Sequence, residues 1–135
     1  MLKSGLKIGL GLALAYIAVV IGFETWLGIS QPSSRRSLVI TTSAQDGSKN
    51  ARVLSALETD GRLYVSANHW PRAWYRQALE NPAIEVEYLG RRGPYQAVAI
   101  SGQEVLEVAA QHPHSLMFRI LTGFPPRFFV RLDPR

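Results

Sequence analysis

Residues 68–82 read Asn68-His-Trp-Pro-Arg-Ala-Trp-Tyr-Arg-Gln-Ala-Leu-Glu-Asn-Pro82. They predict a short aromatic helix between two strands, and the expected fold is organised around this helix. Pro71 suits a first helical position, where its missing N–H costs nothing, and Pro82 ends the helix. The large apolar side chains between the two prolines, Trp74 and Tyr75 among them, gather on one side at helical spacing. A helix of about ten residues is not stable alone in water, so we expect this side to pack on the neighbouring strands.

Strands are expected both before and after this helix. Branched and alternating residues predict six of them. They are Ser37–Thr42, Ala51–Glu58, Arg62–Ala67, Ile84–Leu89, Tyr95–Ile100 and Arg127–Leu132. We expect a hairpin turn at Thr59-Asp60-Gly61 and a second turn over residues 90–93.

A second helix is expected late in the chain. Helix-compatible spacing runs from Glu107 to Leu121, but Pro113 interrupts it. We therefore expect the helix to start near His114 and to end at Gly123. Six short strands and two helical insertions predict a mainly β, α+β domain over residues 37–135, which is a small antiparallel barrel with few free edges.

The N-terminal region has a different composition. Lys3 and Lys7 precede an uncharged run, and a helix over residues 8–29 is about 33 Å long, enough to cross a membrane. We expect residues 1–29 to form a single-pass membrane anchor and residues 30–36 to form a linker. A cleaved secretory signal is the alternative, although no convincing small-x-small cleavage site follows the run. The lysines favour an N-terminus inside the cell, whereas Arg35 and Arg36 favour the reverse.

Charge and composition exclude several functions. The net charge is +5 with scattered arginines, so we predict no nucleic-acid partner, and a phosphate-bearing molecule or an anionic membrane fits as well. There is no cysteine, which excludes thiolate catalysis and disulfides. No nucleophile with an activating base is recognisable, so we assign no catalytic side chain. His112 and His114 flank Pro113 without a third ligand, and we predict no metal site.

The turn Ala44-Gln-Asp-Gly-Ser-Lys-Asn50 is the candidate binding feature outside the aromatic helix. A glycine-bearing turn presents backbone N–H groups, and Ser48, Lys49 and Arg52 add a hydroxyl and two cations. These groups predict a site for a phosphate. A solvated hairpin turn with ordinary surface charges remains the alternative interpretation.

Several of these segments together resemble the deazaflavin-dependent nitroreductase family. They are Val39–Thr42, the Gly47-Ser-Lys turn, Arg52 and, above all, residues 73–86, with Trp74-Tyr75 followed by Asn81-Pro82. The resemblance covers roughly residues 37–102. It implies a split β-barrel related to the flavin-mononucleotide-binding barrels. It also implies an oxidoreductase that passes a hydride from reduced coenzyme F-420, a deazaflavin, to quinones, nitro compounds or other electron-poor acceptors.

The resemblance also implies a site. It places the cofactor phosphate and acidic tail near Ser48, Lys49 and Arg52. It places the ring system against the second and third strands and the aromatic helix, at Ser55, Ala56, Leu57, Ser66, Ala67 and Trp74. The cofactor then carries the chemistry, and no side chain need act as a general acid. Split barrels often pair, so a homodimer is also expected.

Asp46 distinguishes this turn from the family's more cationic turn. FMN, a tetrapyrrole, a lipid-like molecule or no ligand therefore remain alternatives to the deazaflavin. We expect a membrane-anchored oxidoreductase acting on a lipophilic acceptor, and the supply of the cofactor favours the cytoplasmic side. The alternative is a non-enzymatic barrel that binds an apolar ligand or a membrane partner.

Overall fold

The computed structural model describes residues 2–29, 36–67, 73–124 and 126–135. Its contacts divide the chain into two compact units. One unit contains the helices α1 (Leu2–Ile29) and α4 (Leu116–Thr122), and the other contains the sheet with α2 (Ala73–Glu80) and α3 (Gln103–Gln111). In sequence, α4 lies within the predicted barrel domain, but it is grouped with α1. Most of the predicted linker, and the predicted helix start at Pro71, lie outside the described residues.

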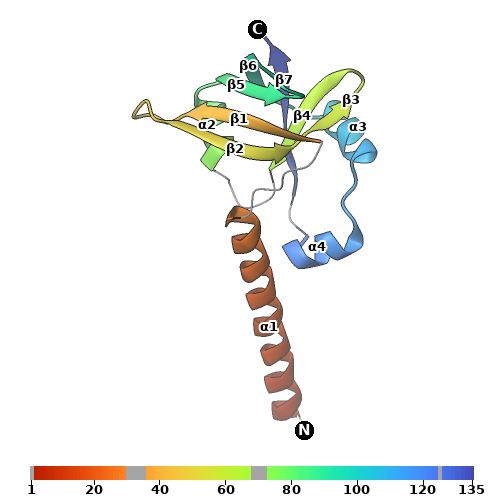
Figure 1. Cartoon of the computed structure of the whole chain (residues 1–135). Helices are drawn as coiled ribbons and strands as arrows, with labels where there is room; N and C mark the ends of the chain where they lie inside the picture. The colour runs from red at the N-terminus through yellow and green to blue at the C-terminus, as the bar shows by residue number, and fades with distance from the viewer. Residues whose placement is uncertain (1, 30–35, 68–72, 125) are drawn as a thin grey trace. The chain divides into compact units, whose positions relative to one another are not determined.

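The second unit is built on one curled antiparallel sheet (Figure 1). Its strands are β1 (Ser37–Ser43), β2 (Lys49–Ser55), β3 (Leu57–Thr59), β4 (Arg62–Ala67), β5 (Ala83–Tyr88), β6 (Arg91–Ala99) and β7 (Phe128–Pro134). They pair in the order β2-β1-β5-β6-β7-β4-β3. The predicted α+β barrel is thus confirmed as a curled half-barrel sheet with short helices.

The number of strands differs from the prediction. The expected strand over residues 51–58 is two strands, β2 and β3, which are separated at Ala56. The N–H of Ala56 donates to the carbonyl oxygen of Arg36 (2.7 Å). This bond ends the pairing of β2 with β1 next to the start of β1. After Ala56 the chain forms β3, which pairs with β4 in a hairpin.

The inner face of the sheet holds the main core. Burial alternates along β1, with Leu38, Ile40 and Thr42 turned inward. The predicted aromatic helix, α2, packs on this face, where Trp74 is 5% exposed and Ala78 is fully buried. The hydroxyl of Thr42 donates to Oε1 of Gln77 (2.6 Å). The expectation that this helix packs on the strands is therefore confirmed.

A second core lies on the opposite, outer face of β4 and β7. Tyr64 and Phe129 pack there against Val108 of α3. A helix was expected only after Pro113, and α3 corrects that expectation: there is a helix on each side of the proline, which separates α3 from α4. Gly102 has a φ of 65° and precedes α3 directly.

Two hairpin turns set the register around the sheet. Asp60 and Gly61 have φ of 51° and 73°, which confirms the predicted turn between β3 and β4. The turn between β5 and β6 falls earlier than predicted, at Leu89 and Gly90, with φ of 52° and 74°. Strand β6 consequently begins at Arg91, so Arg92 belongs to the ladder and not to a loop.

The position of the inner core predicts that truncating two valines on paired strands will cost different amounts of stability. Val86 of β5 is fully buried, whereas Val98 of β6 is only half-buried. Val86→Ala should lower the free energy of unfolding by about 2 kcal/mol because it leaves a cavity. The matched Val98→Ala should cost less than about 1 kcal/mol. Urea denaturation of the detergent-solubilised chain measures both values, and equal losses would contradict this placement of the core.

Candidate functional site

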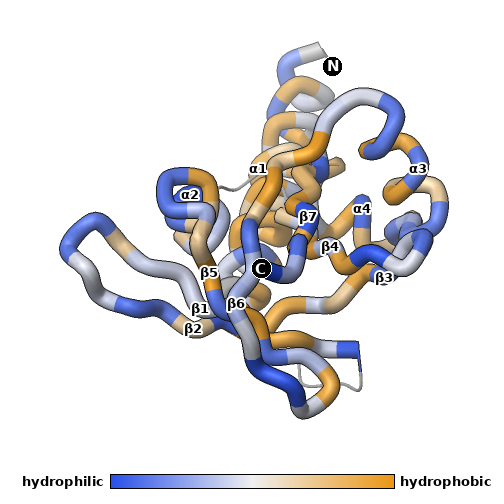
Figure 2. The backbone as a smooth tube through the Cα atoms, turned by 90° about the horizontal axis from the view of Figure 1, so that it is seen from above, coloured by the Kyte–Doolittle hydropathy of each residue, from blue (hydrophilic) through white to orange (hydrophobic). Residues whose placement is uncertain are grey.

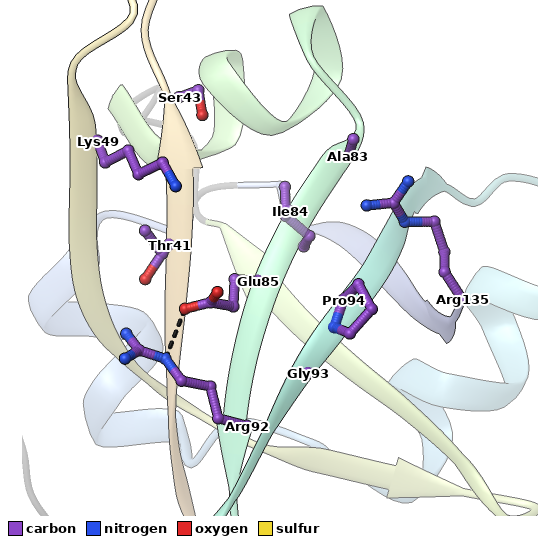
Figure 3. A pocket seen from close by; sticks show the side chains of 10 residues that line it. All are labelled: Thr41, Ser43, Lys49, Ala83, Ile84, Glu85, Arg92, Gly93, Pro94 and Arg135. Carbon is purple, nitrogen blue, oxygen red and sulfur yellow. Dashed lines mark ion pairs between the residues drawn. The ribbon is translucent and has the colours of Figure 1, made fainter.

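A cleft of about 410 Å³ opens over β2, β1, β5 and β6 (Figure 3). Most of its polar side chains stand at positions that alternate with the inner core residues, and so they lie on the outer face of the sheet. It is lined by Thr41, Ser43, Lys49, Ala83, Ile84, Glu85, Arg92, Gly93, Pro94 and Arg135. The cleft is therefore a surface feature backed by the packed barrel core.

Positive charge dominates this cleft. It has three cationic side chains, Lys49, Arg92 and Arg135, and one carboxylate, Glu85. Nε of Arg92 lies 2.5 Å from Oε1 of Glu85. Figure 3 shows this pair beside Thr41, with Arg135 near Ala83. Within the described part of the chain, Lys49 and Arg135 form no side-chain ion pair, so the cleft retains uncompensated positive charge.

Strand register explains why these cations share a face. In the β1–β2 ladder, Lys49 is opposite Ser43, an outer position. Arg52 is opposite Ile40, which is fully buried in the inner core. Residues directly opposite each other in a ladder share a face. Lys49 and Arg52, which we expected to bind one phosphate, therefore start on opposite faces of the sheet.

In the turn between β1 and β2, the carboxylate of Asp46 is hydrogen-bonded to Ser48 of the same turn. Oδ1 of Asp46 accepts hydrogen bonds from the N–H of Ser48 (2.9 Å) and from its hydroxyl (2.6 Å). Figure 2 shows this turn as a strongly hydrophilic tip. The hydroxyl bond is the main cause that lowers the pKa of Asp46, and the N–H bond adds to it. Two donors of the predicted phosphate site are thus engaged by Asp46.

The residues expected around the cofactor ring differ in burial and in the core that they join. Three of them are buried in the inner core, and Leu57 packs in the second core. The three buried residues are Ala56, Ala67 and Trp74. Ser66 is half-buried, and its hydroxyl lies 3.4 Å from Nη2 of Arg127. Ser55 is exposed at the end of β2 and lies on the same face of the strand as Lys49.

A second cavity of about 320 Å³ has a more aromatic lining. Tyr88 and Tyr95, which pack against the inner core, line it together with Glu58. The Tyr88 hydroxyl donates to Oε1 of Glu58 (2.7 Å). This hydrogen bond is the largest cause that raises the pKa of Tyr88. Leu63 and Leu132 add aliphatic walls, and Arg62 and Asp133 add charged groups, so the cavity has a mixed lining.

No protein-family model matches the sequence, and no curated protein matches it significantly. Solved structures do match its fold. An F420-H2 dependent reductase, FDR-A, is 20% identical, with a TM-score of 0.55 over 75% of this chain and 98% of that one. The chain has a split-barrel fold. The resemblance to deazaflavin-dependent enzymes is thereby confirmed at the level of the fold.

Other split barrels of similar structure have different descriptions. A pyridoxamine 5'-phosphate oxidase-related, FMN-binding protein from Nostoc punctiforme is 16% identical, with a TM-score of 0.53 over 74% of this chain and 71% of that one. HutZ, the heme storage protein from Vibrio cholerae, is 18% identical, with a TM-score of 0.58 over 76% and 83%. The shared fold is therefore compatible with more than one ligand class.

Five polar side chains of the cleft outside the turn were not expected from the sequence: Thr41, Ser43, Glu85, Arg92 and Arg135. Glu85 is half-buried on β5, at a position that alternates with the inner core residues Ile84 and Val86. Arg92 was assigned to a turn, and that error hid its position opposite Glu87 in the ladder. Arg135 comes into the cleft because its N–H donates to the carbonyl oxygen of Pro94 (3.1 Å), a pairing that no local pattern reveals.

The Asp46 turn predicts a pH effect with a defined sign. Because folding lowers this pKa, the bonds to Ser48 are present above the ordinary aspartate pKa and are lost as the pH falls through the lowered value. Carboxyl-carbon NMR should give an Asp46 midpoint below that of an ordinary aspartate. Ser48→Ala should raise the midpoint by removing the hydroxyl donor. A midpoint in the unchanged chain at or above the ordinary value would contradict the turn geometry.

Proposed function

We propose that this protein is a membrane-anchored oxidoreductase. It transfers a hydride from reduced coenzyme F-420, or from reduced FMN, to a lipophilic acceptor such as a quinone or a nitro compound. The observation that carries this proposal is the fold shared with an F420-H2 dependent reductase along almost the whole length of that chain. The cation-lined cleft supports it, because both cofactors carry phosphate and the deazaflavin also carries an acidic tail.

The cleft supplies groups that suit such an anion. Lys49 and Arg135 offer cationic donors, and Thr41 adds a hydroxyl to the lining. Glu85 contacts Arg92 at Nε, which leaves the two terminal nitrogens of the guanidinium outside that contact. A guanidinium held in this way is oriented to bind phosphate or carboxylate oxygens. The bound cofactor supplies the hydride chemistry, and the protein binds and orients it.

The apolar helix α1 supports the choice of a lipophilic acceptor. The most apolar 18-residue window within residues 3–27 of α1 has a mean hydropathy of 2.2, and none of that window is buried within the protein. A helix of this length and composition fits a membrane span. The span holds the barrel where a membrane-dissolved acceptor is concentrated. We place the barrel on the cytoplasmic side because the reduced cofactor is supplied there, and we expect a homodimer.

A non-enzymatic ligand-binding barrel is the second candidate. Two observations favour it: Asp46 occupies donors of the predicted phosphate turn, and a second cavity near Tyr88 has two tyrosines and two leucines in its lining. A split barrel described as a heme storage protein shows that the same fold is associated with a non-redox description. This candidate predicts ligand retention without oxidation of a reduced cofactor.

Charge removal in the cleft tests the proposed cofactor site. In the full chain in detergent, Lys49→Ala and Arg92→Ala should each weaken binding of coenzyme F-420 or FMN by about tenfold, because each removes a charge-assisted contact. Quenching of tryptophan fluorescence measures the binding. Arg91→Ala is the matched control: Arg91 is exposed, lies next to Arg92 and does not line the cleft, so its affinity should change less than twofold.

The outcomes separate the two candidates. Selective weakening by the cleft variants, with hydride transfer by the unchanged chain, supports the oxidoreductase. Equal effects of Arg91→Ala and Arg92→Ala would mean that only net charge matters. Failure of a folded chain to bind either cofactor, together with saturable binding of haem, would replace the proposal with the ligand-binding barrel.

A further inference from the structure

Helix α4 packs along the middle of the apolar helix α1. The hydroxyl of Tyr16 donates to the carbonyl oxygen of Ile120 (2.8 Å). The rings of Phe23 and Phe118 meet edge to face, with centroids 6.0 Å apart. These contacts lie inside one compact unit. They place α4 beside residues 16–23 of the candidate span and not beyond its end.

The position along α1 gives a depth. At a rise of about 1.5 Å per residue, Phe23 lies about 6 Å and Tyr16 about 16 Å before Leu27, the end of the candidate span. Half of a hydrocarbon core is about 15 Å thick. If α1 spans a bilayer, α4 is therefore at the level of one leaflet, between the headgroups and the bilayer centre.

The side of α4 that does not face α1 is also apolar. Leu116 and Met117 are 65% and 66% exposed, and Phe124 just after the helix is 53% exposed. Arg119 is the only charged residue from Ser115 to Phe124, and its guanidinium lies 5.4 Å from the centroid of the Phe124 ring. A helix in water would present polar residues on this side. An apolar side with one long cationic side chain, which reaches toward headgroups, suits lipid.

The ends of α4 are closed by internal hydrogen bonds. The Ser115 hydroxyl accepts from the N–H of Phe118 (3.1 Å). Gly123, at φ 78°, ends the helix, and the N–H of Phe124 donates to the carbonyl oxygen of Arg119 (2.8 Å). Tyr16 satisfies the carbonyl oxygen of Ile120. Backbone groups inside a bilayer need such partners, because no water is available there.

We infer that α4 is a second membrane element, which is embedded beside α1 in one leaflet with Leu116, Met117 and Phe124 against lipid acyl chains. This inference rests on the proposed anchoring by α1. The lipid surface is the expected occupant because the apolar side of α4 continues the apolar surface of the span. The protein is then attached by two elements that are far apart in the sequence.

Site-directed spin labelling tests this inference without background, because the chain has no cysteine. The full chain carrying Met117→Cys is labelled and reconstituted in phosphatidylcholine vesicles. Leu116→Cys is a second α4 position, Leu10→Cys reports on the span, and Glu107→Cys on exposed α3 is the aqueous control. Relaxation by oxygen, which partitions into lipid, is compared with relaxation by a water-soluble nickel chelate.

We expect the oxygen-to-nickel ratio at both α4 positions to exceed that at Glu107→Cys severalfold, as at Leu10→Cys. Lipid exposure at Leu10→Cys with aqueous values at both α4 positions would overturn the inference and leave the anchor intact. Aqueous values at Leu10→Cys as well would overturn the anchoring and, with it, the embedded α4.

Discussion

The pairing of Ser43 with Lys49 fixes the β1–β2 register at the end of the hairpin, and the rest of the candidate site depends on it. Side chains alternate between the two faces along a strand, so a slip of one residue would exchange every one of them. In the observed register, Ile40 is in the core and Lys49 is over the cleft. The same register sends Arg52 to the inner side, away from Lys49.

Contacts on the inner face support that register, and an ion pair on the outer face joins the neighbouring strands β5 and β6. On the inner face, Gln77 of α2 accepts from Thr42, which is fully buried, and the aromatic residues of the helix pack on the core. On the outer face, Glu85 forms an ion pair with Arg92. An exposed ion pair of this kind adds little stability. Its consequence is orientation, because it keeps a guanidinium beside a cleft that an anionic ligand would use.

Local patterns predicted the elements whose causes are local. Pro82 and the aromatic spacing identified α2, alternation identified most of the strands, and Asp60-Gly61 identified a hairpin. The break at Ala56 depends on a bond to Arg36, 20 residues earlier, and so it was missed. The cleft was mostly missed for the same reason: Lys49 was predicted, but Arg92 and Arg135 join it only through strand pairing. The capture of Ser48 by Asp46 is local, and the spacing of an Asx turn could have predicted it.

We propose that the outer face, and not the turn with Arg52, binds the anionic part of a cofactor. The most direct test is an NMR spectrum of the arginine Nε–H groups in the full, detergent-solubilised chain, recorded with and without coenzyme F-420 or FMN. Our account predicts that the signals of Arg92 and Arg135 shift on saturation while that of Arg52 stays in place. A shift confined to Arg52 would contradict it and return the site to the opposite face of the sheet.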